Sequence, residues 1–237
     1  MERQVVCYKD LGEMDYKTAW DYQETLLQEN VKIKSAAKGF TPPTADKNST
    51  TNYLLFVEHP PVYTLGKSGK IENVLINEQQ RNERGIDFFH TNRGGDITFH
   101  GPAQIVGYPI LDLEKFYTDI GRYLRELEEV ILLTLKEFGI EGSRSKGETG
   151  VWIDAGNLGR ERKVCAMGVR CSRWITMHGF ALNVNTNLDY FNNIIPCGIQ
   201  NKKVTSMKEE LGENADIDHV KEILKRNFGK VFNADIL

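Results

Sequence analysis

The spacing of apolar residues predicts three amphipathic helices. Over 116–138, apolar side chains recur every three or four residues from Phe116 to Phe138, which places them in one stripe along a helix. The segments 13–31 and 217–231 show the same spacing, with polar residues between the apolar ones. Helices are therefore expected to be few and widely separated along the chain.

Shorter apolar runs between turn-forming residues predict strands. Two of these runs are separated only by His59-Pro60-Pro61, and the first must end there because proline has no N–H to donate to a neighbouring strand. The segment 35–52 is polar and rich in Pro, Ser and Thr, and it predicts a loop. The predicted strands are 53–58, 62–65, 86–91, 97–100, 104–110, 150–153, 163–170 and 176–184.

The order of these elements favours an α+β fold. Strands dominate the middle of the chain, and we find no internal repeat and no linker of the kind that separates domains. The regular alternation of strands and helices that builds parallel sheets is absent. We therefore expect a single domain over 1–237, with mixed β-sheets flanked by helices.

Composition argues against several classes of protein. The chain has 30 Lys and Arg, 33 Asp and Glu and 40% hydrophobic residues, which is ordinary for a globular protein and unlike a strongly basic nucleic-acid binder. No apolar run approaches the ~18–20 residues needed to cross a bilayer. The segment 1–16 carries acidic residues and lacks the apolar core of a signal peptide. These features predict a soluble cytoplasmic protein that binds neither membrane nor nucleic acid.

The common cofactor and metal motifs are missing. Gly66-Lys67-Ser68 resembles the end of a phosphate-binding P-loop, but Pro61 stands where that motif has its first glycine. No G-x-G-x-x-G run opens a helix, and no H-E-x-x-H or close Cys/His spacing indicates a metal site. We therefore expect neither a cofactor nor a metal.

One cysteine has unusual neighbours in the sequence. The cysteines are Cys7, Cys165, Cys171 and Cys197, with no C-x-x-C pair among them. Cys197 lies between Pro196 and Gly198, which predict a rigid turn that presents the thiol. Only about 3% of an ordinary thiol is ionised at pH 7, and a nearby lysine cation would raise that fraction. The alternative for Cys197, and our interpretation of the other cysteines, is a buried inert thiol.

Two further segments carry candidate chemistry. In 93–109, Gly94-Gly95 would let a ligand approach the backbone closely, and His100 adds a polar side chain. A β-hairpin with a tight bend and a structural histidine explains the same residues. Lys163 begins an otherwise apolar strand, so it is either a partly desolvated amine or the solvated end of that strand.

Taken together, these segments resemble the octanoyltransferase family, the lipoyl(octanoyl) transferases of lipoate biosynthesis. The similarity covers roughly 53–207, and its motifs occur in the order and spacing of that family. They are HPPVYTLGKSG (59–69), RGGDITFHGPAQIVGYP (93–109), GETGVW (147–152), KVCAMGVR (163–170), SRW followed by TMHGFALNVN (172–185) and PCGI (196–199).

The resemblance implies a fold and a reaction. The fold is that of the biotin and lipoate protein ligases, an α+β single domain with the N-terminal and C-terminal helices packed on the core. The reaction moves octanoyl from octanoyl-acyl carrier protein to a lysine of an acceptor protein. The acceptors are lipoyl domains of 2-oxo acid dehydrogenases and the glycine-cleavage H protein.

The resemblance also implies roles for particular residues. Cys197 would be the acyl-thioester nucleophile, and Lys163 would lower its pKa and act in proton transfer. Ala103 departs from the family, which usually has glycine there, and this puts the placement of Gln104 in doubt. The residues expected to line the acyl site are Arg93, Gly94, Gly95, Asp96, Ile97, Thr98, Phe99, His100, Ala166, Met167, Gly168, Gly179, Phe180 and Ala181.

Acyl carrier protein is acidic, so the resemblance predicts a local basic patch, although each candidate could equally belong to a mixed-charge surface. The candidates are Arg144, Lys146, Arg170, Arg173, Lys202 and Lys203.

Three alternative functions remain open. An ATP-dependent lipoate or biotin protein ligase shares the fold, but it forms an acyl-adenylate and needs no cysteine. An amidotransferase that moves octanoyl or lipoyl between proteins uses the same cysteine and lysine with another donor. A non-catalytic acyl-binding module would keep the pocket and form no covalent adduct.

Overall fold

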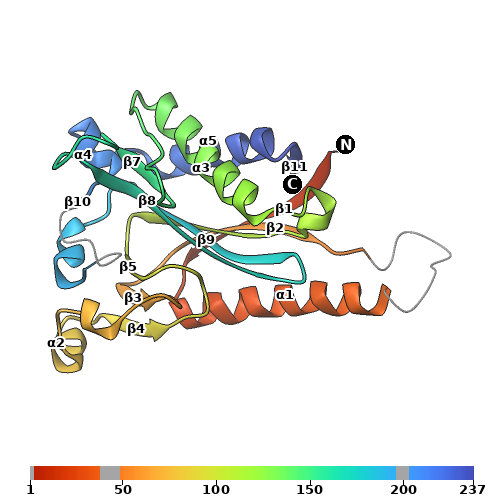
Figure 1. Cartoon of the computed structure of the whole chain (residues 1–237), viewed down its shortest axis with the longest axis horizontal. Helices are drawn as coiled ribbons and strands as arrows, with labels where there is room; N and C mark the ends of the chain where they lie inside the picture. The colour runs from red at the N-terminus through yellow and green to blue at the C-terminus, as the bar shows by residue number, and fades with distance from the viewer. Residues whose placement is uncertain (1–2, 38–48, 196–202) are drawn as a thin grey trace.

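The computed structural model describes residues 3–37, 49–195 and 203–237, which form two β-sheets and the helices around them (Figure 1). The main sheet has the strand order β10-β8-β9-β6-β2-β1-β11, with β7 paired to β8, and the smaller sheet has the order β4-β3-β5. Both sheets contain parallel and antiparallel pairs. The strands are β1 (Gln4–Glu13), β2 (Asn52–Glu58), β3 (Val62–Leu65), β4 (Asp87–His90), β5 (Ile97–His100), β6 (Gln104–Ile110), β7 (Val151–Ile153), β8 (Arg162–Ser172), β9 (Ile175–Asn183), β10 (Lys203–Val204) and β11 (Ala234–Ile236).

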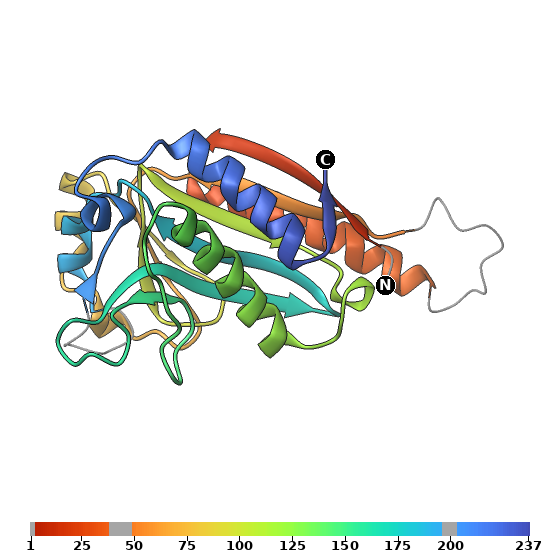
Figure 2. The same cartoon turned by 90° about the horizontal axis from the view of Figure 1, so that it is seen from above.

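Helices cover both faces of the main sheet. The long helix α1 lies against one face, and α3 and α5 lie side by side on the other (Figures 1 and 2). Short 3₁₀ turns occur at Ile71–Asn73, Leu113–Lys115 and Leu188–Asn193. The α-helices are α1 (Tyr16–Ala37), α2 (Glu78–Glu83), α3 (Ile120–Glu137), α4 (Met207–Leu211) and α5 (Ile217–Val231).

The alternation of side chains along β2 explains this layering. Leu54 and Phe56 point into the core beneath α3 and α5, and Leu55 and Val57 point into the core beneath α1. Successive side chains of a strand face opposite sides of the sheet, so a central strand that is apolar at every position from 53 to 57 must be covered on both faces. The observed architecture is the α+β arrangement of mixed sheets and flanking helices that the sequence predicts.

Capping residues set the ends of the predicted helices. Asp216 accepts backbone hydrogen bonds at the start of α5, which coincides with the prediction of 217–231. Asp119 does the same for α3, so this helix begins at Ile120 rather than at 116. The predicted loop 35–52 begins too early, because α1 continues to Ala37.

The sequence did not predict β1, β10 and β11. In β1 only Val6 is fully buried, so the strand lacks the apolar alternation by which strands are recognised. The strands β10 and β11 have two and three residues, too few to show any period. Pairing with neighbouring strands defines all three. Within the described ranges, no helix has both the length and the apolar character needed to cross a membrane.

A buried ion pair joins the end of α1 to the end of β6, and we expect its loss to be costly. Lys34 Nζ lies 2.6 Å from Asp112 Oδ1, and the two side chains are 11% and 6% exposed. Thr50 donates its hydroxyl to the other carboxylate oxygen at 2.8 Å. Replacing Asp112 by alanine leaves Lys34 with the half-exposed Glu114 as its partner, at 2.9 Å, and removes the acceptor of the Thr50 hydroxyl, so the free energy of unfolding should fall by about 2 kcal/mol in urea titrations.

The matched control is Asp21→Ala. Asp21 forms an i,i+4 pair with Lys17 on the surface of α1, where both side chains are more than half exposed. Such pairs contribute little, so a change below about 0.5 kcal/mol is expected. Equal losses in the two variants would contradict the role assigned to Asp112.

Candidate active site

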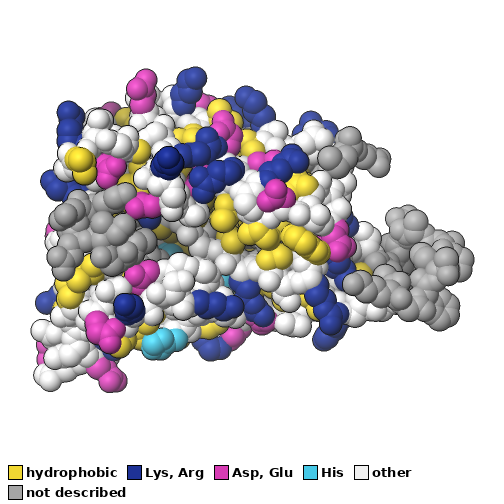
Figure 3. All heavy atoms as spheres, viewed as in Figure 1, with side chains coloured by type: hydrophobic (Ala, Val, Ile, Leu, Met, Phe, Trp, Pro, Cys, Tyr) yellow, Lys and Arg dark blue, Asp and Glu magenta, His cyan; other side chains and the backbone are white. Residues whose placement is uncertain are grey.

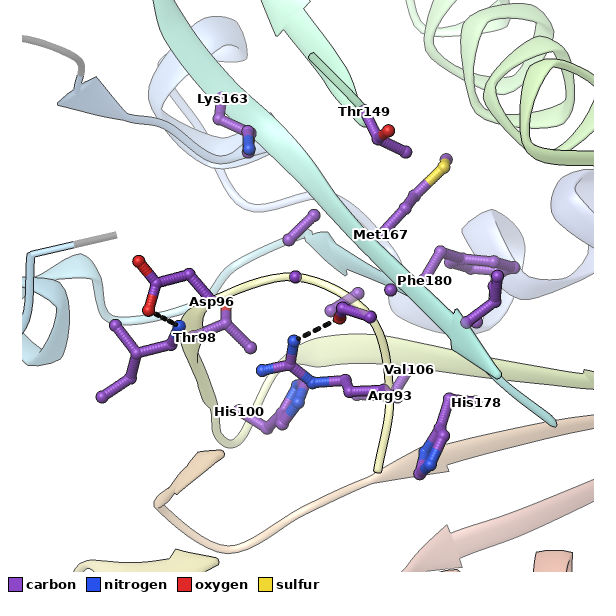
Figure 4. Close-up of a pocket in the computed structure, with 18 of the residues that line it drawn as sticks. Arg93, Asp96, Thr98, His100, Val106, Thr149, Lys163, Met167, His178 and Phe180 are labelled. Atoms are coloured by element: carbon purple, nitrogen blue, oxygen red, sulfur yellow. Dashed lines mark hydrogen bonds between the residues drawn. The ribbon is translucent and has the colours of Figure 1, made fainter. Parts of the chain in front are cut away.

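A cavity of about 510 Å³ lies where the motif segments meet (Figure 4). Its walls come from β8 and β9, the turn before β5, helix α3 and the loop before β7. Every residue that we expected to line the acyl site lines this cavity, except Phe99. They are Arg93, Gly94, Gly95, Asp96, Ile97, Thr98, His100, Ala166, Met167, Gly168, Gly179, Phe180 and Ala181.

Strand pairing brings two of the motif segments together. In the antiparallel pair of β8 and β9, Ala166 lies opposite Ala181, and Gly168 lies opposite Gly179. Gly94 donates its backbone N–H to the carbonyl of Val169 at 2.9 Å, which holds the Arg93 turn against β8. A Cβ atom on Gly168 would lie 2.6 Å from the carbonyl oxygen of Gly94, so only glycine permits this approach.

The run Gly66-Lys67-Ser68 supports the same turn. Its three backbone N–H groups donate to the carbonyls of Asp96, Arg93 and Gly95 at 3.0–3.1 Å. These residues thus act as a brace for the turn through their main chain.

Arg93 ties the turn to the smaller sheet. Its guanidinium donates to the carbonyl of Thr64 at 2.6 Å, to the Thr64 hydroxyl at 2.9 Å and to the carbonyl of Gly94 at 3.0 Å. The side chain is buried. These contacts hold a positive charge at the edge of the cavity.

His100 belongs to a buried hydrogen-bond chain. Gln104 donates its amide N–H groups to the carbonyl of Phe99 at 3.1 Å and to Asn183 Oδ1 at 2.8 Å, so its Oε1 accepts from His100 Nδ1 at 2.9 Å. This pattern assigns His100 the neutral tautomer with hydrogen on Nδ1. Asn183 in turn donates to the carbonyl of Thr205 at 2.9 Å. His100 is thus a hydrogen-bonded structural histidine that also lines the cavity.

Phe99 and Ala103 depart from expectation. Phe99 points away from the cavity, because alternation along β5 sends it into the core of the smaller sheet, where it stacks on Tyr190 with ring centroids 4.5 Å apart. Ala103 has a φ of +59°, a conformation that favours glycine. Its N–H donates to Glu58 Oε2 and its carbonyl accepts from Asn185, so the turn keeps Gln104 in place despite the methyl group.

Lys163 lies at the polar side of the cavity. Its Nζ is 4.5 Å from the centroid of the Trp152 ring, a cation–π contact. Figure 4 shows Lys163 and Asp96 toward one side, and Phe180 and Val106 toward the other. The cavity therefore has Lys163 and Asp96 on one side and an apolar patch that includes Val106 and Phe180 on the other.

The predicted nucleophile, Cys197, lies in 196–202, outside the described residues. The chain on either side of this segment contacts the site: Phe191 and Val204 both line the cavity, and Val204 pairs with Lys163. Burial raises the thiol pKa of both Cys165 and Cys171. This supports our interpretation of these two thiols as inert.

Comparison with known proteins identifies the family. A model of the lipoyl protein ligase A/B catalytic domain matches residues 15–229. The chain belongs to this family. The match extends well beyond 53–207, where the recognisable motifs lie.

Several relatives of high identity are octanoyltransferases. Those of Flavobacterium johnsoniae and Christiangramia forsetii are 58% and 56% identical, over 97% and 96% of both chains. That of Cytophaga hutchinsonii is 50% identical, over 98% of this chain and 94% of its own. At such identity over nearly the whole length, this family member is an acyltransferase of the lipoyl(octanoyl) transferase type.

Solved structures confirm the expected fold. A bipartite lipoate protein ligase from Thermoplasma acidophilum superposes with a TM-score of 0.68 at 16% identity, covering 100% of this chain and 86% of that one. A lipoate-protein ligase A solved with ATP gives 0.64 at 14% identity, covering 100% and 90%. The lipoyl protein ligase fold is thus present at low sequence identity.

Sequence reasoning missed part of the cavity lining of this family member. His178 and Asn183 lie in the TMHGFALNV run that we had identified, but nothing in that run singles them out. Ile120 and Leu124 belong to the apolar stripe of α3 and could not be distinguished from ordinary core residues. The loop residues Gly147, Glu148 and Thr149 complete the wall.

Two of the six candidates for the predicted basic patch, Arg144 and Arg170, form ion pairs with acidic side chains of the chain. Arg144 pairs with Glu128 and Glu129, and Arg170 pairs with Glu24 at 2.6 Å. Figure 3 shows Lys and Arg side chains interspersed with acidic ones on the face it presents. Of the other candidates, Lys202 lies outside the described residues. The surface in view is therefore mixed in charge.

Three histidines are buried together beside the cavity. His59 accepts from the Tyr108 hydroxyl at 2.8 Å and contacts the carbonyl of Met14 at 2.7 Å. Burial lowers the pKa of His59 to about 4 and that of His178 to about 3. Burial, with smaller contributions from the neighbouring His59 and Arg93, holds the pKa of His100 well below its usual value. All three are thus neutral in the folded protein near pH 7.

This arrangement predicts acid sensitivity of the fold. Below about pH 6.5 the unfolded chain binds protons at these histidines and the folded chain does not, so the free energy of unfolding falls as pH decreases toward 4. His59 alone should contribute a loss on the order of 3 kcal/mol across this range. Urea titrations at several pH values would measure it.

The control for acid sensitivity is the exposed His219. Replacing it by asparagine should leave the pH dependence of stability unchanged. Replacing His59 by asparagine should reduce the slope between pH 6.5 and 4 by about one proton. An unaltered slope in the His59 variant would contradict the assignment.

Proposed function

We propose that the chain moves an octanoyl group from octanoyl-acyl carrier protein to a lysine of an acceptor protein, through a thioester on Cys197. The acceptors are lipoyl domains of 2-oxo acid dehydrogenases and the glycine-cleavage H protein. The cavity carries this proposal, because it places Lys163 beside a space lined by Val106, Met167 and Phe180. Residues 1–237 act as one catalytic domain.

The apolar lining suits a medium-length acyl chain. Each buried methylene contributes about 0.8 kcal/mol, so removing two methylenes should weaken binding by about 1.6 kcal/mol, or roughly 15-fold. The reacting carbonyl would then lie toward Lys163, and the hydrocarbon tail toward Phe180.

The chain ends that flank 196–202 support a nucleophile near Lys163. Ile195 donates its N–H to the carbonyl of Asn73 at 2.9 Å, which anchors the chain two residues before Cys197. Lys203, six residues after Cys197, pairs with Arg162 beside Lys163, and the next residue, Val204, lines the cavity. The first described residues that follow Cys197 in the sequence therefore lie at the cavity, which supports the proposal.

In the first step the Cys197 thiolate attacks the carbonyl carbon of the donor thioester. The new carbon–sulfur bond forms on Cys197, and the carbon–sulfur bond to the donor breaks, releasing a thiolate that takes up a proton. The Lys163 ammonium favours the thiolate of Cys197 by its charge and supplies that proton. One thioester replaces another, so the step needs no ATP.

In the second step the acceptor lysine attacks the Cys197 thioester. An ordinary lysine is neutral in only about one molecule in 2,500 at pH 7, so a base assists the attack. Lys163, having given up its proton, accepts one from the attacking amine. An amide forms and the Cys197 thiolate leaves, which restores the starting ion pair.

The test is intact mass spectrometry of the full chain after incubation with octanoyl-acyl carrier protein, without ATP. We expect the mass to increase by one octanoyl group, mapped to Cys197, and the group to move to a lipoyl domain added afterwards. Modification of the lipoyl domain only with free octanoate and ATP would instead indicate a ligase. Acylation by an octanoyl protein other than the carrier would indicate an amidotransferase.

A further inference from the structure

The carboxylate of Glu128 on α3 is fully buried and lies outside the proposed chemistry. Its Oε1 accepts the backbone N–H of Gly150 at 2.9 Å. Its Oε2 lies 3.1 Å from Arg144 Nε and 2.8 Å from an Arg125 guanidinium nitrogen. One carboxylate thus holds both Arg144 and Gly150, the two ends of the segment 144–150, which we name the wall loop.

The wall loop forms part of the cavity. Gly147, Glu148 and Thr149 line it, and Figure 4 shows Thr149 on the side away from Arg93 and His178. Only Arg144 and Gly150, the ends of the loop, are bound to Glu128. Glu128 therefore holds the two ends of the loop, and within the loop the Glu148 N–H donates to the carbonyl of Ser145 at 3.2 Å.

The same helix supplies the facing apolar wall. Ile120 and Leu124 line the cavity, and Glu128 follows Leu124 by one helical turn on the same side of α3. Hydrogen bonds to Glu128 therefore tie the wall loop to the helix that carries this apolar wall, in addition to the backbone pairing of Ser143 with Trp152 next to the loop. Charge-assisted hydrogen bonds in a buried position are short and geometrically demanding.

The backbone conformation of Gly150 and its close neighbours restrict where this end of the wall loop can lie. Its φ is +118°, and a Cβ atom there would lie 2.6 Å from the carbonyl oxygen of Cys165 on β8. This end of the loop thus packs closely between α3 and β8, the strand that carries Met167. A small shift of Gly150 would move the wall against the acyl-binding strand.

We propose that Glu128 is a positioning residue that sets acyl-chain selectivity by pinning both ends of the wall loop against α3. The ligand class is a saturated medium-length acyl chain, and this identity rests on the proposed function. With both anchors in place, the space between Leu124 and Met167 has a fixed size. With an anchor lost, the loop can move outward and longer chains fit nearly as well as the preferred one.

The test compares binding of octanoate and decanoate by calorimetry in wild type, Glu128→Gln and Arg144→Ala. Glutamine has the shape of glutamate but no charge with which to bind the two guanidinium groups. Arg144→Ala removes only the contact of Glu128 with the first end of the wall loop and keeps its contact with Gly150. We expect octanoate to bind about tenfold more weakly in Glu128→Gln, and the ratio of the two affinities to shrink about threefold in both variants.

The matched control is Glu129→Gln. Glu129 is 41% exposed and binds the same arginine at 2.6 Å, but it does not contact Gly150. In this variant the ratio of the octanoate and decanoate affinities should stay within about twofold of the wild-type ratio. Thermal unfolding is followed in parallel, since a purely structural role would lower stability without changing the ratio. An unchanged ratio in both anchor variants would overturn the proposal.

The outcomes also separate this proposal from the reaction. If the wild-type chain binds neither acid, the cavity is not an acyl site and the wall-loop proposal is wrong. If the acids bind and the ratio shifts in the anchor variants, but octanoyl-acyl carrier protein gives no adduct, the proposed reaction fails while the role of Glu128 is supported.

Discussion

Replacing Cys197 by alanine is expected to abolish the octanoyl adduct and to lower transfer to a lipoyl domain by on the order of 10⁴-fold or more. The reason is that, in the proposed mechanism, the acyl chain is held as a thioester on Cys197 between the two steps. Serine at this position should fail in the same way, because a hydroxyl is far less ionised than a thiol near pH 7. The readouts are intact mass after incubation with octanoyl-acyl carrier protein and the rate of acceptor acylation.

The control for this loss is Cys171→Ser. Cys171 is half-buried on β8, and burial raises its thiol pKa, so it should contribute nothing to acylation. The control should retain the adduct and the transfer rate. A normal adduct in Cys197→Ala would show that another residue carries the acyl group and would remove the proposed mechanism.

Replacing Lys163 by methionine should slow transfer by about 10²–10⁴-fold. Methionine keeps an apolar stem over the Trp152 ring while removing the charge and the exchangeable protons. A positive charge favours the thiolate, so its removal should raise the pKa of Cys197. Alkylation of Cys197 at pH 7 should then slow about tenfold for each unit of that rise.

The pH profile separates this role from a structural one. In Lys163→Met the alkylation rate should recover at high pH, where Cys197 ionises without help. Lys203→Ala is the matched control, because Lys203 is exposed and pairs through its backbone with Arg162 beside Lys163. An alkylation profile of Lys163→Met that overlays the wild type would assign pKa tuning to another group.

The long periodic segments could be read from sequence because their information is local. Helix α5 has the predicted bounds, and α3 differs by four residues where Asp119 caps it and by one residue at its end. An apolar stripe at helical spacing needs no knowledge of the partner it packs on. By contrast, β1 buries one residue fully, and only its parallel pairing with β2 and β11 makes it a strand.

Some residues of the candidate site could likewise be predicted from the sequence, and others could be found only in the structure. Nearly all of the residues that the motif segments and the resemblance predicted to line the site do line the cavity, because the residue types themselves carry that signal. They could not tell that Phe99 turns away, because the side to which a strand residue points depends on which face the cavity occupies. They could not find Leu124 or Glu128 either, because these belong to an ordinary amphipathic helix until α3 is placed over the wall loop.

The sequence by itself determined the α+β class, the long helices, the family resemblance, and Cys197 and Lys163 as the candidate reactive pair. These depend on local periodicity and on the order of residue types along the chain. Only the tertiary structure decided that His100 is neutral within a hydrogen-bond chain, and that Glu128 holds a wall of the cavity. Burial and hydrogen-bond partners between distant segments set both properties, and neither is encoded in any local stretch of the chain.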